Sequence, residues 1–289
     1  MNDRSATSAG WFADIDPADS KAATEAIREK TAEEPRDWPA KAVDAGFADD
    51  EADYYAKLHE STVESTREAV RERETADDQQ LKHSIRAMDD ATELANELAE
   101  RVAEWAGSRY PDAETGVDYV RELAEREPAS PPDERLVALA RRTAALADEA
   151  DALRAFIERE TPEVAPNLAA LAGPVLAARL ISLAGGLEPL AKKPAGTVQV
   201  LGAEDSLFAH LRGRASSPKH GVIFTHEYVR GTDPEHRGSA ARAFAGKLAI
   251  AARVDHYSGE RKPELDAELR ERIERIRDRI AEASGGDAE

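Results

Sequence analysis

The chain has 289 residues, 58 of them acidic and 39 basic, a net charge of −19 and no cysteine. The lack of cysteine excludes disulfide bonds, thiolate catalysis and cysteine-ligated zinc. No apolar run approaches the length of a membrane span and the first ten residues lack a signal-peptide core, so we expect a soluble cytoplasmic protein with no membrane contact.

The composition also indicates a saline cell. Only ten of the 39 basic residues are Lys. A strongly acidic surface repels itself in dilute buffer, and concentrated salt screens that repulsion. We therefore expect a halophilic protein from a high-salt cytoplasm. An acidic mesophilic protein with disordered flanks is the alternative.

The pattern of the chain predicts a mainly α fold in four parts. Residues 1–75 concentrate the aromatic side chains and are interrupted by Pro17, Pro35 and Pro39. This composition predicts a small N-terminal α+β domain with a thin core. Such a region folds either alone or only against a partner, and its composition fits both.

Residues 76–160 predict a long antiparallel coiled-coil hairpin. Apolar residues recur at spacings of three and four after Asp77 and again after Asp133, and the proline-rich segment 128–132 separates the two runs. We expect Trp105, at the end of the first helix, to lie in the core. The seam packs within one chain or also joins two chains as a homodimer, and both remain open. The predicted seam residues are Leu81, Ile85, Leu136, Leu139, Leu146 and Leu153.

Residues 161–260 predict a third, helical part. The run 167–183 is almost entirely apolar and is interrupted at Gly173-Pro174, which predicts a bent, buried helix pair. Residues 197–201 fit either a strand or a helical turn, residues 222–224 predict a strand, and residues 237–255 predict a helix with a basic side. From Pro263, residues 261–289 predict a peripheral C-terminal helix and a disordered tail.

One segment reverses the charge of the chain. Residues 185–257 contain ten Lys or Arg against seven Asp or Glu, which gives this segment +3 and leaves −22 for the rest, and they hold five of the seven histidines. Phosphate binding depends on local charge rather than on the total, so this segment predicts contact with a polyanion.

Simpler roles explain several residues of this part. The histidine spacings match no compact metal motif, and the glycines fit no Walker or dinucleotide pattern, so we predict neither a metal centre nor a cofactor. Glu204 is expected to orient the start of a helix rather than to act in catalysis. Arg179 is expected to pair inside the helical core, and Arg253 to pair with Asp255.

Short motifs in one order between residues 164 and 255 then resemble a known family. They are VAPNL at 164–168, AARLI at 177–181, AGGL at 184–187, LAK at 190–192, TVQVLGAE at 197–204, LF at 207–208, PKHGVIF at 218–224, RG at 237–238, AR at 241–242 and KLAIAARVD at 247–255. Together they look like the Nop domain. The whole chain resembles the archaeal Nop proteins of box C/D guide ribonucleoproteins.

This resemblance implies a non-catalytic scaffold. Such a protein binds box C/D guide RNA jointly with the kink-turn-binding protein, forms a dimer through the coiled coil, and recruits fibrillarin for RNA-guided ribose 2′-O-methylation of rRNA or tRNA. The implied RNA-binding residues are Lys219, His220, Arg237, Arg242, Lys247 and Arg212. The implied surface for RNA and the partner protein is Gln199, Gly202, Ala203 and Glu204. His220 would stack on a base or contact the backbone; a loop histidine without a ligand is the alternative.

The chain departs from the family pattern at three positions. Asp205, Ala209 and Ser239 stand where the family usually has basic residues, and residues 1–75 are shorter and more acidic than its N-terminal domain. In molar salt the counterion-release contribution to phosphate binding is nearly exhausted, so recognition would depend on shape and hydrogen bonds. The rival interpretation is a protein-interaction scaffold whose degenerate Nop domain no longer binds RNA. An RNA-modifying enzyme would need a cofactor motif, and the sequence has none.

Overall fold

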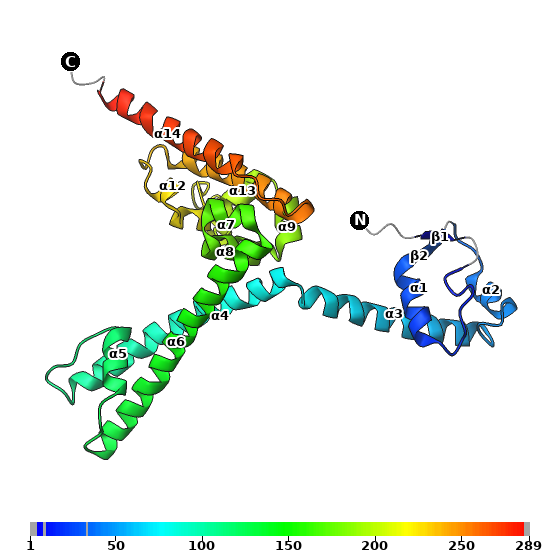
Figure 1. Ribbon diagram of the computed structural model, residues 1–289, viewed down its shortest axis with the longest axis horizontal. Coiled ribbons are helices and arrows are strands. Elements are labelled where there is room, and N and C mark those ends of the chain that lie inside the picture. The colour runs from blue at the N-terminus through cyan, green and yellow to red at the C-terminus, as the bar shows by residue number, and fades with distance from the viewer. Residues whose placement is uncertain (1–4, 8–9, 33, 286–289) are drawn as a thin grey trace. The chain divides into compact units, whose positions relative to one another are not determined.

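The computed structural model describes residues 5–7, 10–32 and 34–285, and the chain is mainly helical (Figure 1). This confirms the fold class predicted from the apolar spacing. Contacts between residues divide the chain into two compact units, Met1–Ala76 and Asp77–Glu289. The disorder predicted for the end of the chain concerns residues 286–289, which lie outside the described residues.

The described residues of the first unit pack three helices and two short strands around aromatic side chains. Helices α1 (Ser20–Glu29), α2 (Trp38–Asp44) and α3 (Glu51–Glu74) each begin after an aspartate whose carboxylate accepts a hydrogen bond from a backbone N–H of the first turn. Strands β1 (Ser5–Thr7) and β2 (Lys30–Ala32) pair in parallel. Phe12, Phe47 and Tyr54 are buried at the centre of this unit.

The second unit begins with a helical hairpin. Helix α4 (Asp77–Gly107) and helix α6 (Pro131–Val164) are antiparallel, and the short helix α5 (Val117–Ala124) packs against α6 near the tip (Figure 1). Ser130 caps α6. The first turn of this helix contains two prolines, because a missing backbone N–H is tolerated there. Arg109 Nε donates to Asp133 Oδ1 at 2.9 Å and fixes the end of α4 to the start of α6.

The hairpin is held by alanines rather than by the predicted leucine seam alone. The buried residues of α4 and α6 include Ala91, Ala95, Ala99, Ala140, Ala144 and Ala147. Leu81, Ile85 and Leu136 are buried as well, but Leu139, Leu146 and Leu153 are only half-buried. Small side chains let two helices approach closely, which displaces the longer leucines to the flanks.

Trp105 contradicts the sequence prediction. It was expected in the core, yet its side chain remains 36% exposed at the end of α4. Its neighbours Val102 and Ala106 are buried in its place. Apolar spacing finds the apolar side of a helix but not which positions on its edge a partner helix covers.

Eight α-helices and one 3₁₀ helix among the described residues complete the second unit. They are α7 (Pro166–Ala172), α8 (Pro174–Ala184), α9 (Leu187–Lys192), α10 (Ala195–Val200), α11 (Glu204–Leu211), η1 (Val222–Thr225), α12 (Glu227–Arg230), α13 (Arg237–Tyr257) and α14 (Glu264–Gly285). Their main core contains Leu180, Ile181, Phe244 and Leu248, each at most 1% exposed. Helix α13 is the central element, because α7, α9, α10, α12 and α14 all pack against it.

Helices α7 and α8 form the predicted bent pair. Gly173 separates them with φ +76°, a left-handed conformation that favours glycine, and the two helices are bent by 117°. No single described helix is long and apolar enough to cross a membrane, and α7 with α8 reaches that length only across this bend. Most of their side chains are buried in the core of the unit.

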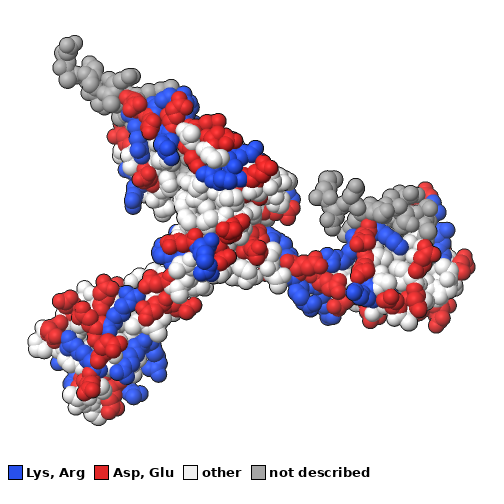
Figure 2. Space-filling view, in the orientation of Figure 1, with Lys and Arg blue, Asp and Glu red and all other residues white. Residues whose placement is uncertain are grey.

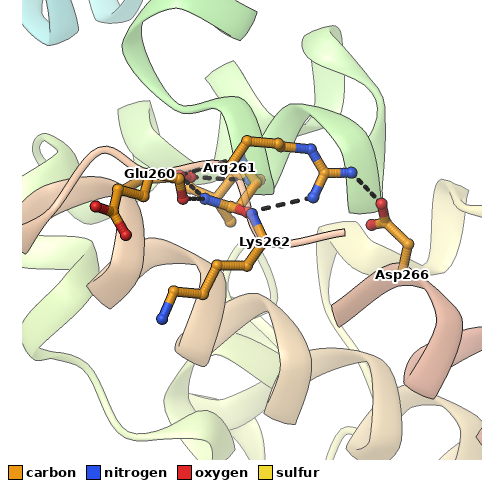
Figure 3. Close-up of polar contacts among 7 residues, drawn as sticks. Glu260, Arg261, Lys262 and Asp266 are labelled. Atoms are coloured by element: carbon orange, nitrogen blue, oxygen red, sulfur yellow. Dashed lines mark hydrogen bonds and ion pairs between the residues drawn. The ribbon is translucent and has the colours of Figure 1, made fainter. Parts of the chain in front are cut away.

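A buried polar network fixes the end of α13. Asp255, 6% exposed, accepts hydrogen bonds from the backbone N–H groups of Asn167 and Leu168 at 3.0 and 2.9 Å, and thereby caps α7. The Asn167 amide reaches the backbone of Glu260 and Lys262 at 2.8 and 2.7 Å (Figure 3). The loop before α14 is therefore tied to α7.

The expected pair between Arg253 and Asp255 is wrong. Burial raises the pKa of Asp255, although its hydrogen bonds to Leu168 and Asn167 oppose that shift. Arg253 Nη2 instead donates to the Lys193 carbonyl at 3.2 Å. Residues two apart on a helix point in different directions, which separates the two side chains.

Charged residues of α4 support the rest of the unit. Arg179 of α8 pairs with Asp89 of α4, as a half-buried link between two helices rather than inside the core. Asp78 Oδ2 accepts a hydrogen bond from Leu187 N at 2.7 Å and caps α9. These contacts join the base of the hairpin to the helices that carry the basic segment.

Candidate nucleic-acid interface

The candidate interface is built on a loop held against the end of α10. Gly221 N donates to the Gln199 carbonyl at 2.8 Å, and Val222 N donates to the Leu201 carbonyl at 2.7 Å. The Gln199 side chain donates to the Lys219 carbonyl at 2.7 Å. Gln199 is therefore a structural residue of this loop, which fixes where Lys219 and His220 lie.

Gly221 is required by the close approach of two backbones. A Cβ atom at this position would lie 1.9 Å from the Leu201 carbonyl oxygen. Since real Cβ atoms essentially never come within 3.0 Å of another heavy atom, no other residue fits without moving the loop. The glycine that the sequence placed between His220 and Val222 thus has a packing reason.

The predicted strand at residues 222–224 is wrong. These residues form the 3₁₀ helix η1, and Ile223 is fully buried in the main core. The two N–H groups that bond to α10 belong to Gly221 and Val222, and no extended segment of the described chain lies alongside to continue a ladder. For residues 197–201 a strand or a helical turn was open; residues 197–200 belong to α10, and Leu201 follows directly after this helix.

Lys219, His220 and Arg237 come together around Phe224. The His220 ring stacks on the Phe224 ring with 4.6 Å between centroids and 16° between planes, and the Arg237 guanidinium lies 5.5 Å from the same ring. A Cβ atom on Gly238 would lie 3.9 Å from Lys219 Cδ, so the Lys219 side chain runs beside the first turn of α13. Three of the predicted RNA-binding residues therefore share one surface.

Electrostatics give these three residues different roles. Burial, and secondarily the neighbouring charge of Arg237, lowers the pKa of His220, which favours the neutral form of its ring. A neutral ring offers stacking and a hydrogen bond rather than a charge. Arg237 donates from Nε to the Thr232 carbonyl at 3.0 Å, which fixes the guanidinium at the N-terminus of α13. Lys219 is exposed and adds a second positive charge to this surface.

The surface before this loop combines a turn and an exposed helix. Gly202 has φ +79°, and its N–H donates to Glu204 Oε1 at 3.0 Å. Glu204 thus orders the turn through Ala203 into α11, which agrees with its predicted orienting role. Helix α11 buries none of its residues, and Phe208 and Leu211 are 56% and 70% exposed. Arg212 is exposed directly after this helix.

Arg242 and Lys247 do not join this cluster. They lie on α13 five and ten residues after Arg237, which turns Arg242 by about 140° around the helix axis. Both line a groove between α13 and α14, where Lys247 pairs with Glu268. The basic side predicted for residues 237–255 is therefore divided between two surfaces.

Two contributions were missed at the level of sequence. Phe224 supports both His220 and Arg237, and its place three residues after Gly221 in PKHGVIF was the available signal. Arg272 and Arg275 of α14 reach the groove beside α13, although their helix is strongly charged throughout and offers no such signal. The described residues contain no group of three or more His, Asp or Glu that could hold a metal ion.

Comparison with known proteins decides the family. The Nop family model, described as "snoRNA binding domain, fibrillarin", matches residues 120–279, from α5 through most of α14. The chain belongs to the Nop family. The match covers the α10 turn, the loop with Lys219 and His220, and the whole of α13, so the surface around Phe224 lies within the shared domain.

Three relatives and one solved structure illustrate the similarity. The chain is 53% identical over 122 residues to an uncharacterized NOP5 family protein of Methanocaldococcus jannaschii, a match that covers 42% of this chain and 30% of that protein. It is 38% identical over 141 residues to nucleolar protein 56 of Saccharomyces cerevisiae, covering 49% and 28% of the two chains. It is 30% identical over 246 residues to nucleolar protein 58 of Schizosaccharomyces pombe, covering 72% and 48%.

A crystal structure of a fibrillarin/Nop5p complex contains a chain of similar architecture. The TM-score is 0.51 at 26% sequence identity, over 89% of this chain and 92% of that one. By contrast, the aligned part makes up less than half of each of the three curated relatives above. The shared fold extends beyond the residues that the family model matches.

Proposed function

We propose that this Nop-family chain is a non-catalytic core subunit of a box C/D ribonucleoprotein. It binds a kink-turn of the guide RNA together with the kink-turn-binding protein, and it recruits fibrillarin for RNA-guided ribose 2′-O-methylation of rRNA or tRNA. The observation that carries this proposal is the surface around Phe224, where the stacked ring of His220 and the guanidinium of Arg237 both contact Phe224 and Lys219 lies beside the first turn of α13. An unstacked base and its phosphate need such a combination.

The surface divides the contacts between RNA and protein. Lys219 and His220, with Arg237 fixed behind them, face the RNA. The turn of Gly202, Ala203 and Glu204 and the exposed apolar side chains of α11 face the kink-turn-binding protein, because exposed Phe208 and Leu211 offer apolar area and no charge. Arg212 lies at the border of these two areas. The absence of basic residues at 205 and 209 fits an α11 that binds protein more than phosphate.

The other partners follow from the family and the fold. A fibrillarin/Nop5p complex is among the similar structures, which supports the first unit, with its aromatic core, as the fibrillarin-binding part. The half-buried Leu139, Leu146 and Leu153 and the 49% exposed Leu94 on the hairpin support a homodimer through this helix pair. A cytoplasmic location and a high-salt cell complete the proposal.

Reconstitution in molar KCl tests the proposal. A kink-turn RNA is titrated with this chain in the presence and absence of the kink-turn-binding protein, and a supershifted complex is expected only with both. The variant Lys219→Ala/His220→Ala should remove the supershift, while Arg135→Gln/Arg270→Gln, which removes two exposed charges elsewhere, should leave it intact. Absence of a supershift with the wild-type chain at any salt concentration would refute RNA binding.

The same titration tests the rival function. A scaffold that binds only proteins would still bind the kink-turn-binding protein, for which α11 offers an exposed apolar side, but no RNA would enter the complex. The loss of basic residues at 205, 209 and 239 favours this alternative. Pull-down with the kink-turn-binding protein alone, followed by RNA addition, separates the two functions.

A further inference from the structure

A groove between α13 and α14 lies apart from the surface around Phe224. It has a volume of about 690 Å³, and its α13 side contains Ser239, Arg242, Gly246 and Ile250. Arg272 and Arg275 of α14 form part of the opposite side. Basic and acidic side chains both crowd this part of the molecule (Figure 2).

Among the described residues, two arginines of the groove lack a counter-charge. Lys247 pairs with Glu268, and Arg275 lies 3.5 Å from Glu271, so both acidic residues that line the groove are already paired. Within the part of the chain that the structure describes, Arg242 and Arg272 make neither a hydrogen bond nor an ion pair, and both are exposed. A chain with 19 more negative than positive charges thus keeps two unpaired cations on opposite walls of one groove.

The floor of the groove is lined by small residues, so it suits the backbone of a ligand better than a large side chain inserted as an anchor. Gly246 has no atom within 4 Å of where its Cβ would be, and Ser239 and Ala243 beside it are small. Ile250, 40% exposed, is the large apolar side chain that lies open there, which offers little area to an amphipathic protein helix. A guanidinium fork donates two parallel hydrogen bonds to phosphate, and an arginine on each wall can hold one strand between them.

We propose that the groove between α13 and α14 binds the sugar-phosphate backbone of the guide RNA outside the kink-turn, with Arg242 and Arg272 as its phosphate contacts. This inference rests on the proposed function. It assigns Arg242 to a second RNA surface, turned by about 140° from Arg237, and it adds a residue of α14. The C-terminal helix then takes part in RNA binding as well as in packing.

The test compares two RNAs in the complete complex with the kink-turn-binding protein. One RNA contains only a kink-turn hairpin, and the other is a full guide RNA with flanking stem and single strand. The variant Arg242→Gln/Arg272→Gln should weaken binding of the full guide RNA about tenfold and reduce the slope of log affinity against log salt by about two. Binding of the hairpin should not change. The control is Arg135→Gln/Arg270→Gln, which removes equal charge from surfaces outside the groove, and both RNAs should bind it as they bind the wild type.

Each result separates the inference from the proposed function. If the wild-type chain binds neither RNA, the proposed function fails. If the wild type binds both and the groove variant matches it on the full guide RNA, the inference fails while the proposed function stands. An equal loss on both RNAs would place the groove in the kink-turn contact and overturn the inference. Loss of kink-turn-binding protein in an RNA-free pull-down would show a protein-binding groove instead. Circular dichroism of each variant reports its folding.

Discussion

Replacing Gly221 by alanine tests how the loop with Lys219 and His220 is positioned. The new Cβ atom would lie 1.9 Å from the Leu201 carbonyl oxygen, and ordinary contact begins at 3.4 Å. The loop must therefore move by about 1.5 Å, the difference between these two distances. The two backbone hydrogen bonds of 2.7 and 2.8 Å cannot survive a displacement of that size.

The expected loss of stability follows from the bonds that break. They are the backbone bonds of Gly221 and Val222 and the bond from the Gln199 side chain to the Lys219 carbonyl. At about 1 kcal/mol each, Gly221→Ala should lower the free energy of unfolding by about 3 kcal/mol. For a unit of this size the melting temperature should fall by about 6–12 °C.

The assay combines thermal unfolding with RNA binding, and Gly196→Ala is the matched control. Gly196 lies in α10 beside the same loop, and no atom lies within 4 Å of where its Cβ would be. Alanine there should stabilise the helix by about 0.5–1 kcal/mol and leave RNA binding unchanged. Gly221→Ala should also lose the supershift, because the loop carries Lys219 and His220. A Gly221→Ala protein that melts and binds RNA as the wild type does would refute this account of the loop.

Three further predictions concern the buried groups and the surface charge. Asn167→Ala removes the side-chain hydrogen bonds to Asp255, Glu260 and Lys262 from a fully buried site, and urea unfolding should show that the free energy of unfolding falls by about 2–4 kcal/mol. A decrease of less than about 1 kcal/mol would contradict the role of this network. Burial lowers the pKa of His226 below its ordinary 6.5, so the unfolded chain binds the proton first, and the free energy of unfolding should fall as the pH falls from about 7 to about 5. His226→Asn keeps a capping acceptor for α12 and should reduce this pH dependence, whereas an unchanged pH dependence would contradict the role of His226. Since 58 acidic residues repel one another, the melting temperature should rise steadily from dilute buffer to molar KCl, and a flat or falling curve would argue against a high-salt cell.

The sequence predicted the elements better than their surroundings. The spacing of Leu81, Ile85 and Leu136 was sufficient to find the hairpin, and Gly173-Pro174 was sufficient to find the bend between α7 and α8, because both signals are local. The strand predicted for residues 222–224 was wrong, since a short run of β-branched and aromatic residues also occurs in buried turns. The exposure of Trp105 depended on which side of α4 another helix covers.

The candidate site shows the same division. Its position in the basic segment and the identities of Lys219 and His220 came from local composition and from the resemblance to the Nop domain, which the family match supports for residues 120–279. The grouping of the cations into two surfaces did not come from either source. Arg237 and Arg242 are five residues apart and were predicted to lie on one basic side of a helix, yet helix geometry turns them to different surfaces.

The sequence alone determined the helical class, the acidic background and the family, because apolar period, composition and short motifs are written along the chain. Only the tertiary structure decided that Asp255 holds Asn167 and not Arg253, that Phe224 joins His220 to Arg237, and that Arg242 faces α14. The physical reason is range. Backbone preference and helix period act over a few neighbours. A polar partner is instead chosen by burial and by the packing of chain segments that are far apart in the sequence, as Asn167 and Asp255 are across 88 positions.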